Sequence, residues 1–284
     1  MASLIAVGDN TMDVYLDRNI EYPGGNALNA AVFASRLGAR SAYLGCVGDD
    51  RYGKCLLDSL QKEHVDTSRC RTLPGANGWA CVDSIDGERM FLGSDPGVCR
   101  QLQLSTEDLA YIAQFPLAHS SLYSGLENQL AQIRHASGCL SFDFSDNWVE
   151  FEWKGLIEQV DIAFFSAADL PSQDAHELAL SMQAMGPKIV IITRGARGAL
   201  ATDGQGIHEH PGLPCSVVDS MGAGDGFIAA FLLANQARYG LAECLVRGVD
   251  YAVQVCGWNG GFGHGQTLDV ERSEHLKNAL KNQG

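Results

Sequence analysis

The feature that most limits the fold of this chain is a repeated alternation between short apolar runs and longer segments with helical spacing. Apolar runs of strand length occupy residues 3–9, 41–49, 121–125, 139–145, 161–167 and 188–194. Segments with helical spacing lie between them, as at 26–38, 52–63 and 171–186. This alternation is typical of a parallel sheet with crossover helices on both faces. We therefore expect an α/β fold of three layers.

Two segments interrupt this pattern. Residues 14–23 and 76–95 alternate apolar and polar side chains, and the second contains the turn sequence IDGE at 85–88. A period of two in hydrophobicity indicates short antiparallel strands with one solvent-exposed face. We expect these segments to form a small antiparallel sheet mounted on the main layers as a lid, with a surface hairpin of no function as the alternative.

Length and composition favour one large α/β domain over residues 1–284, since 46% of the residues are apolar and 19% are charged. The formal net charge of −14 disfavours nucleic acid and anionic membranes as partners. No apolar run approaches the roughly 20 residues of a membrane span, and the first residues show no targeting pattern. The nine cysteines show no pairing motif, which favours reduced thiols and a cytoplasmic protein.

The most specific segment is SVVDSMGAGDGFIAAFLLA at 216–234, in which a strand-like run passes through glycines into an apolar helix. Successive backbone N–H groups of Gly222, Ala223 and Gly224 at a helix N-terminus suit a phosphate anion. Asp225 beside them suits a general base for an attacking hydroxyl. A plain helix-capping aspartate is the alternative, but it explains neither the three glycines nor the second acid, Asp219.

Two other glycine motifs partly match known nucleotide-binding patterns, and both are disfavoured as nucleotide-binding sites. Residues 48–55, GDDRYGKC, almost spell the phosphate loop of nucleotide hydrolases, but Cys55 replaces the magnesium-binding hydroxyl and two aspartates repel polyphosphate. Residues 222–227, GAGDGF, begin like a dinucleotide fingerprint, but Phe227 stands where the third glycine must let helix and strand approach.

A third glycine motif opens the first helix. Gly24 and Gly25 let the backbone approach a ligand closely, and Asn26 and Asn29 offer amide groups to sugar hydroxyls. A plain N-cap at Asn26 is the alternative interpretation.

These motifs together resemble those of the ribokinase-like (PfkB) family of carbohydrate kinases. DSMGAGDGF at 219–227 is similar to its C-terminal signature, and GGNALNAAVFASRLG at 24–38 is similar to its N-terminal one. VGDDRYG at 47–53 stands where the family carries V-G-x-D-x-x-G, and the match covers nearly the whole chain. The resemblance implies a ribokinase-like fold with a β lid, which in this family sometimes pairs two subunits; we expect a homodimer through the lid.

The resemblance also implies roles for individual residues. Asp225 would be the base, and the amides of Gly222, Ala223 and Gly224 would form the anion hole. Asp13 would bind the sugar, together with the glycines and asparagines of the N-terminal motif, Gly24, Gly25, Asn26 and Asn29. The loop TRGARGAL at 193–200 would lie near the nucleotide through Thr193, Gly195 and Gly198. The implied cofactors are ATP and Mg2+, with K+ near CGWNGGFGHG at 256–265.

Two departures from the family pattern bear on metal and substrate. SAAD, Ser166 to Asp169, replaces the usual N-x-x-E near the nucleotide, which leaves the metal ligands unassigned. FDFSDNW at 142–148 replaces D-x-N-x-R. With the extra Asp9 in GDNTMDVY, these departures resemble the fructoselysine 6-kinase branch, whose members phosphorylate fructosamines. Asp9 could pair with the amine of such a substrate or cap the turn after the first strand.

The sequence thus predicts an ATP-dependent kinase acting on a hydroxyl of a sugar or glycated amino acid, such as fructoselysine at its 6-position. A kinase of an ordinary ketose or ribose-like sugar is the first alternative. An NAD-dependent oxidoreductase is disfavoured by Phe227. A catalytically silent binding protein is disfavoured because Asp13 and Asp225 are both present.

Overall fold

The structure is a computed structural model that describes residues 2–85, 88–149 and 155–281. Its main sheet has eight strands in the order β14-β13-β12-β11-β10-β9-β1-β4. Six of them are parallel: β1 (Ser3–Val7), β4 (Arg40–Leu44), β9 (Ala118–Ser121), β10 (Leu140–Asp143), β11 (Ile162–Ser166) and β12 (Ile189–Thr193). β13 (Ala199–Thr202) and β14 (Ile207–His210) complete one edge as antiparallel strands. The predicted α/β class is confirmed.

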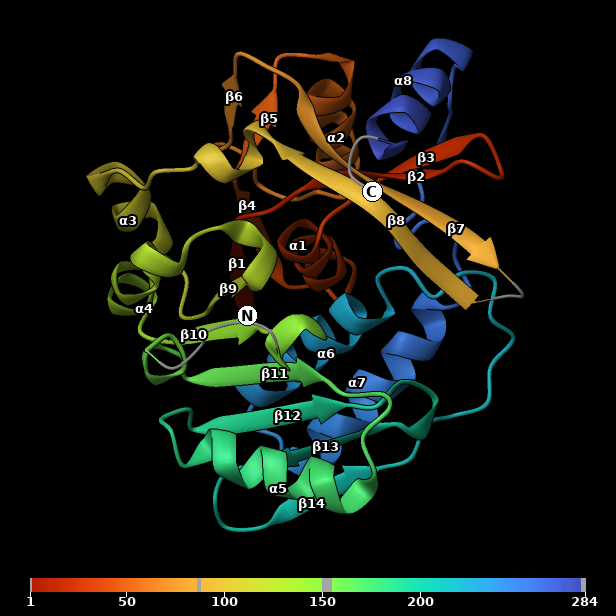
Figure 1. The fold of residues 1–284 in the computed structure, drawn as a ribbon. Coiled ribbons are helices and arrows are strands. Elements are labelled where there is room, and N and C mark those ends of the chain that lie inside the picture. Colours follow the sequence, from red (N-terminus) through yellow and green to blue (C-terminus); the bar gives the residue numbers. More distant parts are fainter. Residues whose placement is uncertain (1, 86–87, 150–154, 282–284) are drawn as a thin grey trace.

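Helices cover both faces of this sheet (Figure 1). One face carries α1 (Asn26–Arg36), α6 (Ala223–Gln236) and α7 (Leu241–Val255), and the other carries α3 (Thr106–Ile112), α4 (Leu130–Ser137) and α5 (Ser172–Gln183). Successive strand residues alternate between the two cores: Leu4 faces the first and Ile5 the second. Because both faces are buried, the strands read as continuous apolar runs in the sequence.

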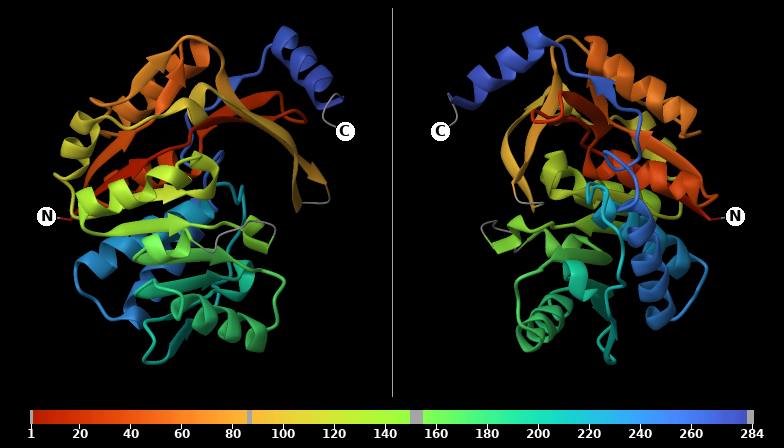
Figure 2. Two further views of the ribbon diagram at one scale, coloured as in Figure 1. Left: turned by 60° about the vertical axis from the view of Figure 1, so that its left-hand side comes forward. Right: turned by 90° about the vertical axis from the view of Figure 1, so that its right-hand side faces the viewer.

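A second sheet of five strands lies beside the main layers, in the order β15-β3-β2-β7-β8. It comprises β2 (Thr11–Tyr15), β3 (Ile20–Gly24), β7 (Asn77–Ile85), β8 (Glu88–Gly97) and β15 (Gln266–Thr267). The β7–β8 hairpin extends away from the body in each view of Figures 1 and 2. Both predicted lid segments thus contribute strands, although Asp86 and Gly87 of the expected turn lie outside the described residues.

This second sheet differs from the expected one in two ways. β2 pairs with β7 in parallel, with Met12 opposite Trp79, so the sheet is mixed rather than wholly antiparallel. The C-terminal β15 adds an edge strand against β3, and α8 (Val270–Lys281) packs on Val14, Trp79 and Cys81 of the outer face. Neither addition is visible from local sequence, because both depend on where a distant segment returns.

Two of the six predicted apolar runs need correction. The run 41–49 is two strands, β4 and β5 (Cys46–Gly48), because the chain leaves the main sheet at Gly45 and β5 pairs with β6 (Arg71–Leu73). At 121–125 only Ser121 belongs to a strand, and a 3-10 turn follows at Leu122–Ser124. α2 (Arg51–Lys62) forms as its pattern indicates.

The strand-like run before the glycine turn is not a strand. Val217 and Val218 are 60% and 50% exposed, and no strand of the described chain pairs with them. The N–H groups of Val218 and Asp219 instead donate to the carbonyl oxygen of Cys256, at 2.8 and 3.2 Å. β-branched residues favour extended backbone, but an extended segment without a neighbouring strand stays a loop.

Two further findings concern the described residues. No helix among them has the length and apolar character needed to cross a membrane. The nine cysteines all lie in described positions, and no disulfide joins them, as the sequence predicts.

Candidate active site

The glycine turn places Asp225 in the first turn of α6. Gly222 is the N-cap residue of this helix and has φ +74°, a left-handed conformation that favours glycine. A Cβ on Gly222 would lie 3.1 Å from the Cα of Gly261, whereas a Cβ on Gly224 would meet no atom within 4 Å. The helix N-terminus therefore opens onto free space at Gly224, as a phosphate site requires.

Of the three predicted anion-hole amides, that of Ala223 already has a partner. Its N–H donates to the Ser220 carbonyl at 3.2 Å, a long bond that closes the turn. The i→i−4 hydrogen bonds of α6 begin with the N–H of Gly226, which donates to the Gly222 carbonyl at 2.8 Å. Donors of a first helical turn have no partner within the helix, which leaves them available to an anion.

Asp225 is half-buried and is held by Asn29 of α1, whose Nδ2 donates to Oδ2 at 2.7 Å. Burial raises the pKa of Asp225 well above its usual value of 3.8. The hydrogen bond from Asn29 lowers this pKa, whereas the carboxylates of Asp143, Asp9 and Asp13 raise it further. A carboxylate with a raised pKa is a stronger base, as proton abstraction from a hydroxyl requires.

Asp13 lies on the second sheet, next to the start of α1. It is 4% exposed, and a Cβ on Gly24 would come within 2.2 Å of its Oδ2. Gly25 has φ +112° and lies against the backbone of Asn10. Neither position therefore has room for a side chain: a side chain at 24 would collide with the Asp13 carboxylate, and one at 25 would collide with the backbone of Asn10.

Asn26 contacts two residues for which the sequence predicted no role. Its Nδ2 donates to Oδ2 of Asp143 at 2.6 Å, and its Oδ1 lies 3.4 Å from Nε2 of His119. Burial raises the pKa of Asp143 to about 6 and lowers that of His119 to about 3, so His119 is neutral. Asp143 is the last residue of β10, and Asp9 comes two residues after β1. An acid near the carboxyl end of a predicted strand was therefore the sequence signal that could have identified Asp143.

Asp9 follows β1 and is 8% exposed. Its Oδ1 accepts hydrogen bonds from the hydroxyls of Ser121 and Ser124, both at 2.8 Å, and from the N–H of Ala27 at 3.3 Å. Asp9 therefore contacts the first turn of α1 and the end of β9 rather than capping only the turn after β1.

The predicted nucleotide-side residues lie at the carboxyl ends of neighbouring strands. Ser166 ends β11 and is paired in register with Thr193, which ends β12. Gly195 follows with φ +55°, and at Gly198, with φ +90°, a Cβ would lie 2.0 Å from the His210 carbonyl oxygen. Ligands of open α/β sheets bind at this edge, where Asp143 and Ser121 also lie.

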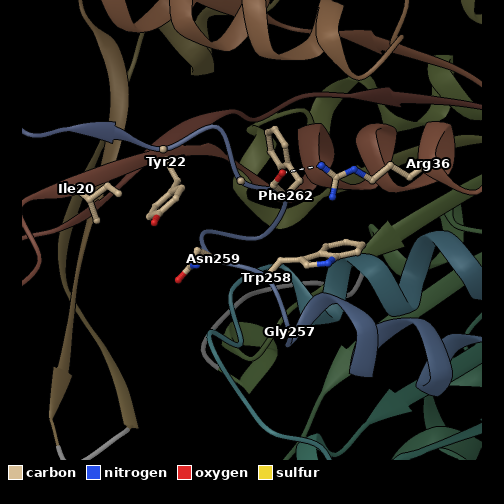
Figure 3. A pocket seen from close by; sticks show the side chains of 9 residues that line it. Ile20, Tyr22, Arg36, Gly257, Trp258, Asn259 and Phe262 are labelled. Atoms are coloured by element: carbon tan, nitrogen blue, oxygen red, sulfur yellow. Dashed lines mark hydrogen bonds between the residues drawn. The ribbon is translucent and has the colours of Figure 1, made fainter.

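A hollow of about 600 Å3 opens between β3 and the loop that follows α7. Figure 3 shows Ile20 and Tyr22 on one side and Trp258 and Asn259 on the other. Arg36 closes its far end, donating to the carbonyl of Phe262 at 2.7 Å. Asp225 is not among the residues that line this hollow.

The two rejected glycine motifs have structural explanations. The side chain of Asp50 caps α2 by accepting from the N–H groups of Tyr52 and Gly53 at 3.1 and 2.9 Å, which fills the position that a phosphate would need. Phe227 is 3% exposed and packs on Phe164 and Phe231 in the core. Neither segment has the geometry of the motif that it resembles.

The fold and the site together define an α/β phosphotransferase, with an acid in the first turn of a helix and further acids near it. A family model described as "pfkB family carbohydrate kinase" matches residues 2–261, and the chain belongs to this family. It is a carbohydrate kinase, as the sequence predicts.

Among curated proteins, the chain is 39% identical over 272 residues to "Fructosamine kinase FrlD" of Bacillus subtilis (strain 168), with 94% of this chain and 95% of the relative covered. It is 35% identical over 265 residues to "Fructoselysine 6-kinase" of Escherichia coli (strain K12), covering 92% and 100%. A "Fructokinase" of Klebsiella pneumoniae is 29% identical, covering 96% and 98%.

Among solved structures, the fold is similar to that of Arabidopsis thaliana ribokinase complexed with ribose and ATP. The TM-score is 0.80 at 20% identity, with 99% of each chain covered. A putative ribokinase II from Escherichia coli in complex with ATP and Mg2+ matches with a TM-score of 0.77 at 18% identity, and each chain is covered completely. These similarities confirm the ribokinase-like fold.

Proposed function

We propose that this kinase transfers the γ-phosphoryl group of ATP to a fructosamine, with the 6-hydroxyl of fructoselysine as acceptor. The observation that carries the proposal is Asp225, a carboxylate of raised pKa at an open helix N-terminus, surrounded by three further carboxylates. The curated relatives at 39% and 35% identity, named for fructosamine and fructoselysine, support the substrate class.

In the proposed reaction, Asp225 takes the proton of the acceptor hydroxyl while its oxygen forms a bond to the γ-phosphorus. The bond between that phosphorus and the β–γ bridging oxygen breaks, and ADP leaves. The amides around Gly222, Ala223 and Gly224, with the positive end of the α6 dipole, stabilise the negative charge on the transferring group. Asn29 keeps the Asp225 carboxylate aimed at the acceptor.

The sugar side of the proposal rests on Asp13 and the residues that frame it. Asp13 would accept hydrogen bonds from sugar hydroxyls, with Gly24 and Gly25 allowing close approach. Asn26 is already fixed by Asp143, so it would offer a preorganised amide.

The amine of a fructosamine distinguishes it from an ordinary ketose. Asp9 and Asp143 both interact electrostatically with Asp225, so several carboxylates surround the proposed acceptor position. A cationic amine in this field gains charge-assisted interactions that a neutral sugar lacks. We propose Asp9 as the carboxylate that pairs with the amine.

The proposed nucleotide site is the carboxyl edge of β11 and β12, with Ser166, Thr193, Gly195 and Gly198. Mg2+ usually keeps several waters and takes one or two carboxylates beside the phosphates. The described residues hold no group of three or more metal-ligating side chains. The exposed Asp169 after β11 is the carboxylate that we propose for Mg2+, which would neutralise charge on the phosphates.

A monovalent cation such as K+ is also part of the proposal. The glycine-rich loop at 256–265 contacts the phosphate-binding turn, since the N–H of Gly260 donates to Asp219 at 3.0 Å. Assays in which K+ is replaced by tetramethylammonium at constant ionic strength test it, and we expect a lower kcat without K+.

We further propose that residues 1–284 act as one cytoplasmic kinase domain whose second sheet is a lid, and that two lids pair in a homodimer. The pairing rests on β8, an edge strand on which Phe91 is 63% exposed. Light scattering of the wild type and Phe91→Glu tests it: a dimer that becomes monomeric supports the proposal, and a wild-type monomer contradicts it.

The substrate is tested by coupled measurement of ATP consumption with fructoselysine, fructose and ribose. We expect kcat/KM for fructoselysine to exceed that for fructose by at least about tenfold, the value of one charge-assisted contact. Asp9→Asn should remove most of this preference, so that the ratio of kcat/KM for fructoselysine to kcat/KM for fructose falls toward one. Phosphorus–proton NMR coupling in the product identifies the phosphorylated hydroxyl.

A kinase of an ordinary ketose is the second candidate, favoured by the fructokinase relative at 29% identity. Equal kcat/KM values for fructose and fructoselysine would select this candidate.

A further inference from the structure

A hydrogen bond joins the lid sheet to the turn that precedes α6. The hydroxyl of Tyr15, the last residue of β2, donates to Oδ2 of Asp219 at 2.6 Å. Both side chains are buried, with Tyr15 2% and Asp219 6% exposed. The two residues are 204 positions apart in the sequence. Only the tertiary structure brings them together, and a buried bond to a carboxylate is among the stronger kinds.

Asp219 holds the phosphate-binding turn with its other contacts. Its Oδ1 accepts from the N–H of Met221 at 3.0 Å, directly before Gly222. Its Oδ2 also accepts from the N–H of Gly260 at 3.0 Å. Gly260 belongs to the loop whose Gly261 lies against Gly222. One carboxylate therefore orients the turn and the loop that supports it.

The strand that supplies Tyr15 also supplies Asp13. The two residues are separated by one position, so their side chains lie on the same face of β2. Asp13 is paired in register with Tyr22, and Tyr15 with Ile20. A shift of β2 that repositions the proposed sugar-binding carboxylate therefore also displaces the hydroxyl that holds Asp219.

We infer that Tyr15 is a positioning residue that acts through Asp219 to fix the phosphate-binding turn, and so links the sugar-binding strand to the phosphate-binding helix. The inference rests on the proposed roles of Asp13 and the α6 N-terminus. It does not depend on which sugar the enzyme accepts.

The test compares Tyr15→Phe with Tyr111→Phe as a matched control. The hydroxyl of Tyr111 also donates to a carboxylate, Oδ2 of Asp66 at 2.7 Å, but it lies on α3, outside the candidate site. Thermal melting first verifies that both variants fold, since each keeps its ring and its packing. Calorimetry with the non-hydrolysable analogue AMP-PNP in the absence of sugar then measures nucleotide affinity without any contribution from the sugar site.

We expect Tyr15→Phe to weaken AMP-PNP binding and to lower kcat for fructoselysine, each by about tenfold, with the sugar KM changed less than about twofold. Tyr111→Phe should match the wild type in all three. In an Asp219→Asn background the further effect of Tyr15→Phe should shrink to less than about twofold, because the two residues act as one unit.

Two outcomes would overturn the inference: equal behaviour of Tyr15→Phe and Tyr111→Phe, or the same loss from Tyr15→Phe in both the wild-type and Asp219→Asn backgrounds. If the wild type does not phosphorylate fructoselysine, the substrate proposal fails while the AMP-PNP comparison still decides the role of Tyr15.

Discussion

At the scale of single residues, the proposed catalysis depends on how one carboxylate is placed and how strongly it holds a proton. Asp225 combines an open helix N-terminus, which attracts negative phosphate, with burial and neighbouring acids that raise its pKa. These influences oppose each other at the carboxylate, and the hydrogen bond from Asn29 favours its ionised form. Two predictions follow from this balance.

The first concerns the base itself. Asp225→Asn keeps the size of the side chain but cannot accept the hydroxyl proton, so kcat should fall by about 10²- to 10⁴-fold. Nucleotide affinity should stay within about threefold, because the backbone donors of α6 remain. Steady-state kinetics and AMP-PNP calorimetry give both values. Normal turnover in this variant would show that another group is the base.

The second concerns Asn29. The base works only when ionised, so the rate falls as the pH drops through the raised pKa of Asp225. Asn29→Ala removes the donor that stabilises the ionised form, which raises that pKa further. The acid limb of the kcat/KM profile should therefore move to higher pH. An unchanged limb with a uniformly lower rate would mean that Asn29 only orients the carboxylate.

At the scale of elements, the glycine turn before α6 and the second sheet are held by segments that lie far from them in the sequence. The C-terminal segment adds β15 to the lid and covers the outer face of the lid with α8. Glu21 of β3 is fully buried and accepts from Arg272 at 3.0 Å and from Gln266 at 3.0 Å. This buried charge anchors α8 to the lid.

Arg272→Ala should therefore destabilise the protein. Glu21 would lose its closest cation but keep Gln266 and the more distant Arg51, so we expect a loss of about 2–3 kcal/mol in the free energy of unfolding. Burial already raises the pKa of Glu21, and the variant raises it further. The loss should thus shrink as the pH falls and Glu21 is protonated in the folded state.

Urea unfolding at pH 7.5 and 5.5 measures this effect. Glu21→Gln in the Arg272→Ala background is the control, and it should recover part of the stability at pH 7.5. A loss below about 0.5 kcal/mol at both pH values would mean that Arg272 does not support the buried carboxylate.

At the scale of the whole molecule, the layers bring acids from distant segments to one edge of the sheet, in a chain whose net charge is −14. Such a field favours a cationic acceptor over a neutral one. ATP must then be held locally, by helix dipole, backbone donors and Mg2+, against the mean field.

Ionic strength tests this reasoning. At saturating ATP and Mg2+, the KM for fructoselysine should rise about three- to tenfold between 0.05 and 0.5 M salt, because added ions screen its attraction to the site. The KM for fructose should change less than about twofold. Equal salt dependence for both sugars would contradict an electrostatic role for the acids.

The sequence by itself determined the α/β class and the glycine turn with its acid, and it supplied the residue types of the proposed sugar site. These features are local. Alternating periodicity defines strands and helices, and the left-handed backbone conformation at position 222 by itself favours glycine. Only the tertiary structure decided that 216–219 is a loop, that Asp143 and His119 adjoin Asn26, and that Tyr15 bonds to Asp219. Such contacts join positions far apart along the chain, and no local pattern records which distant side chain will fill a given space.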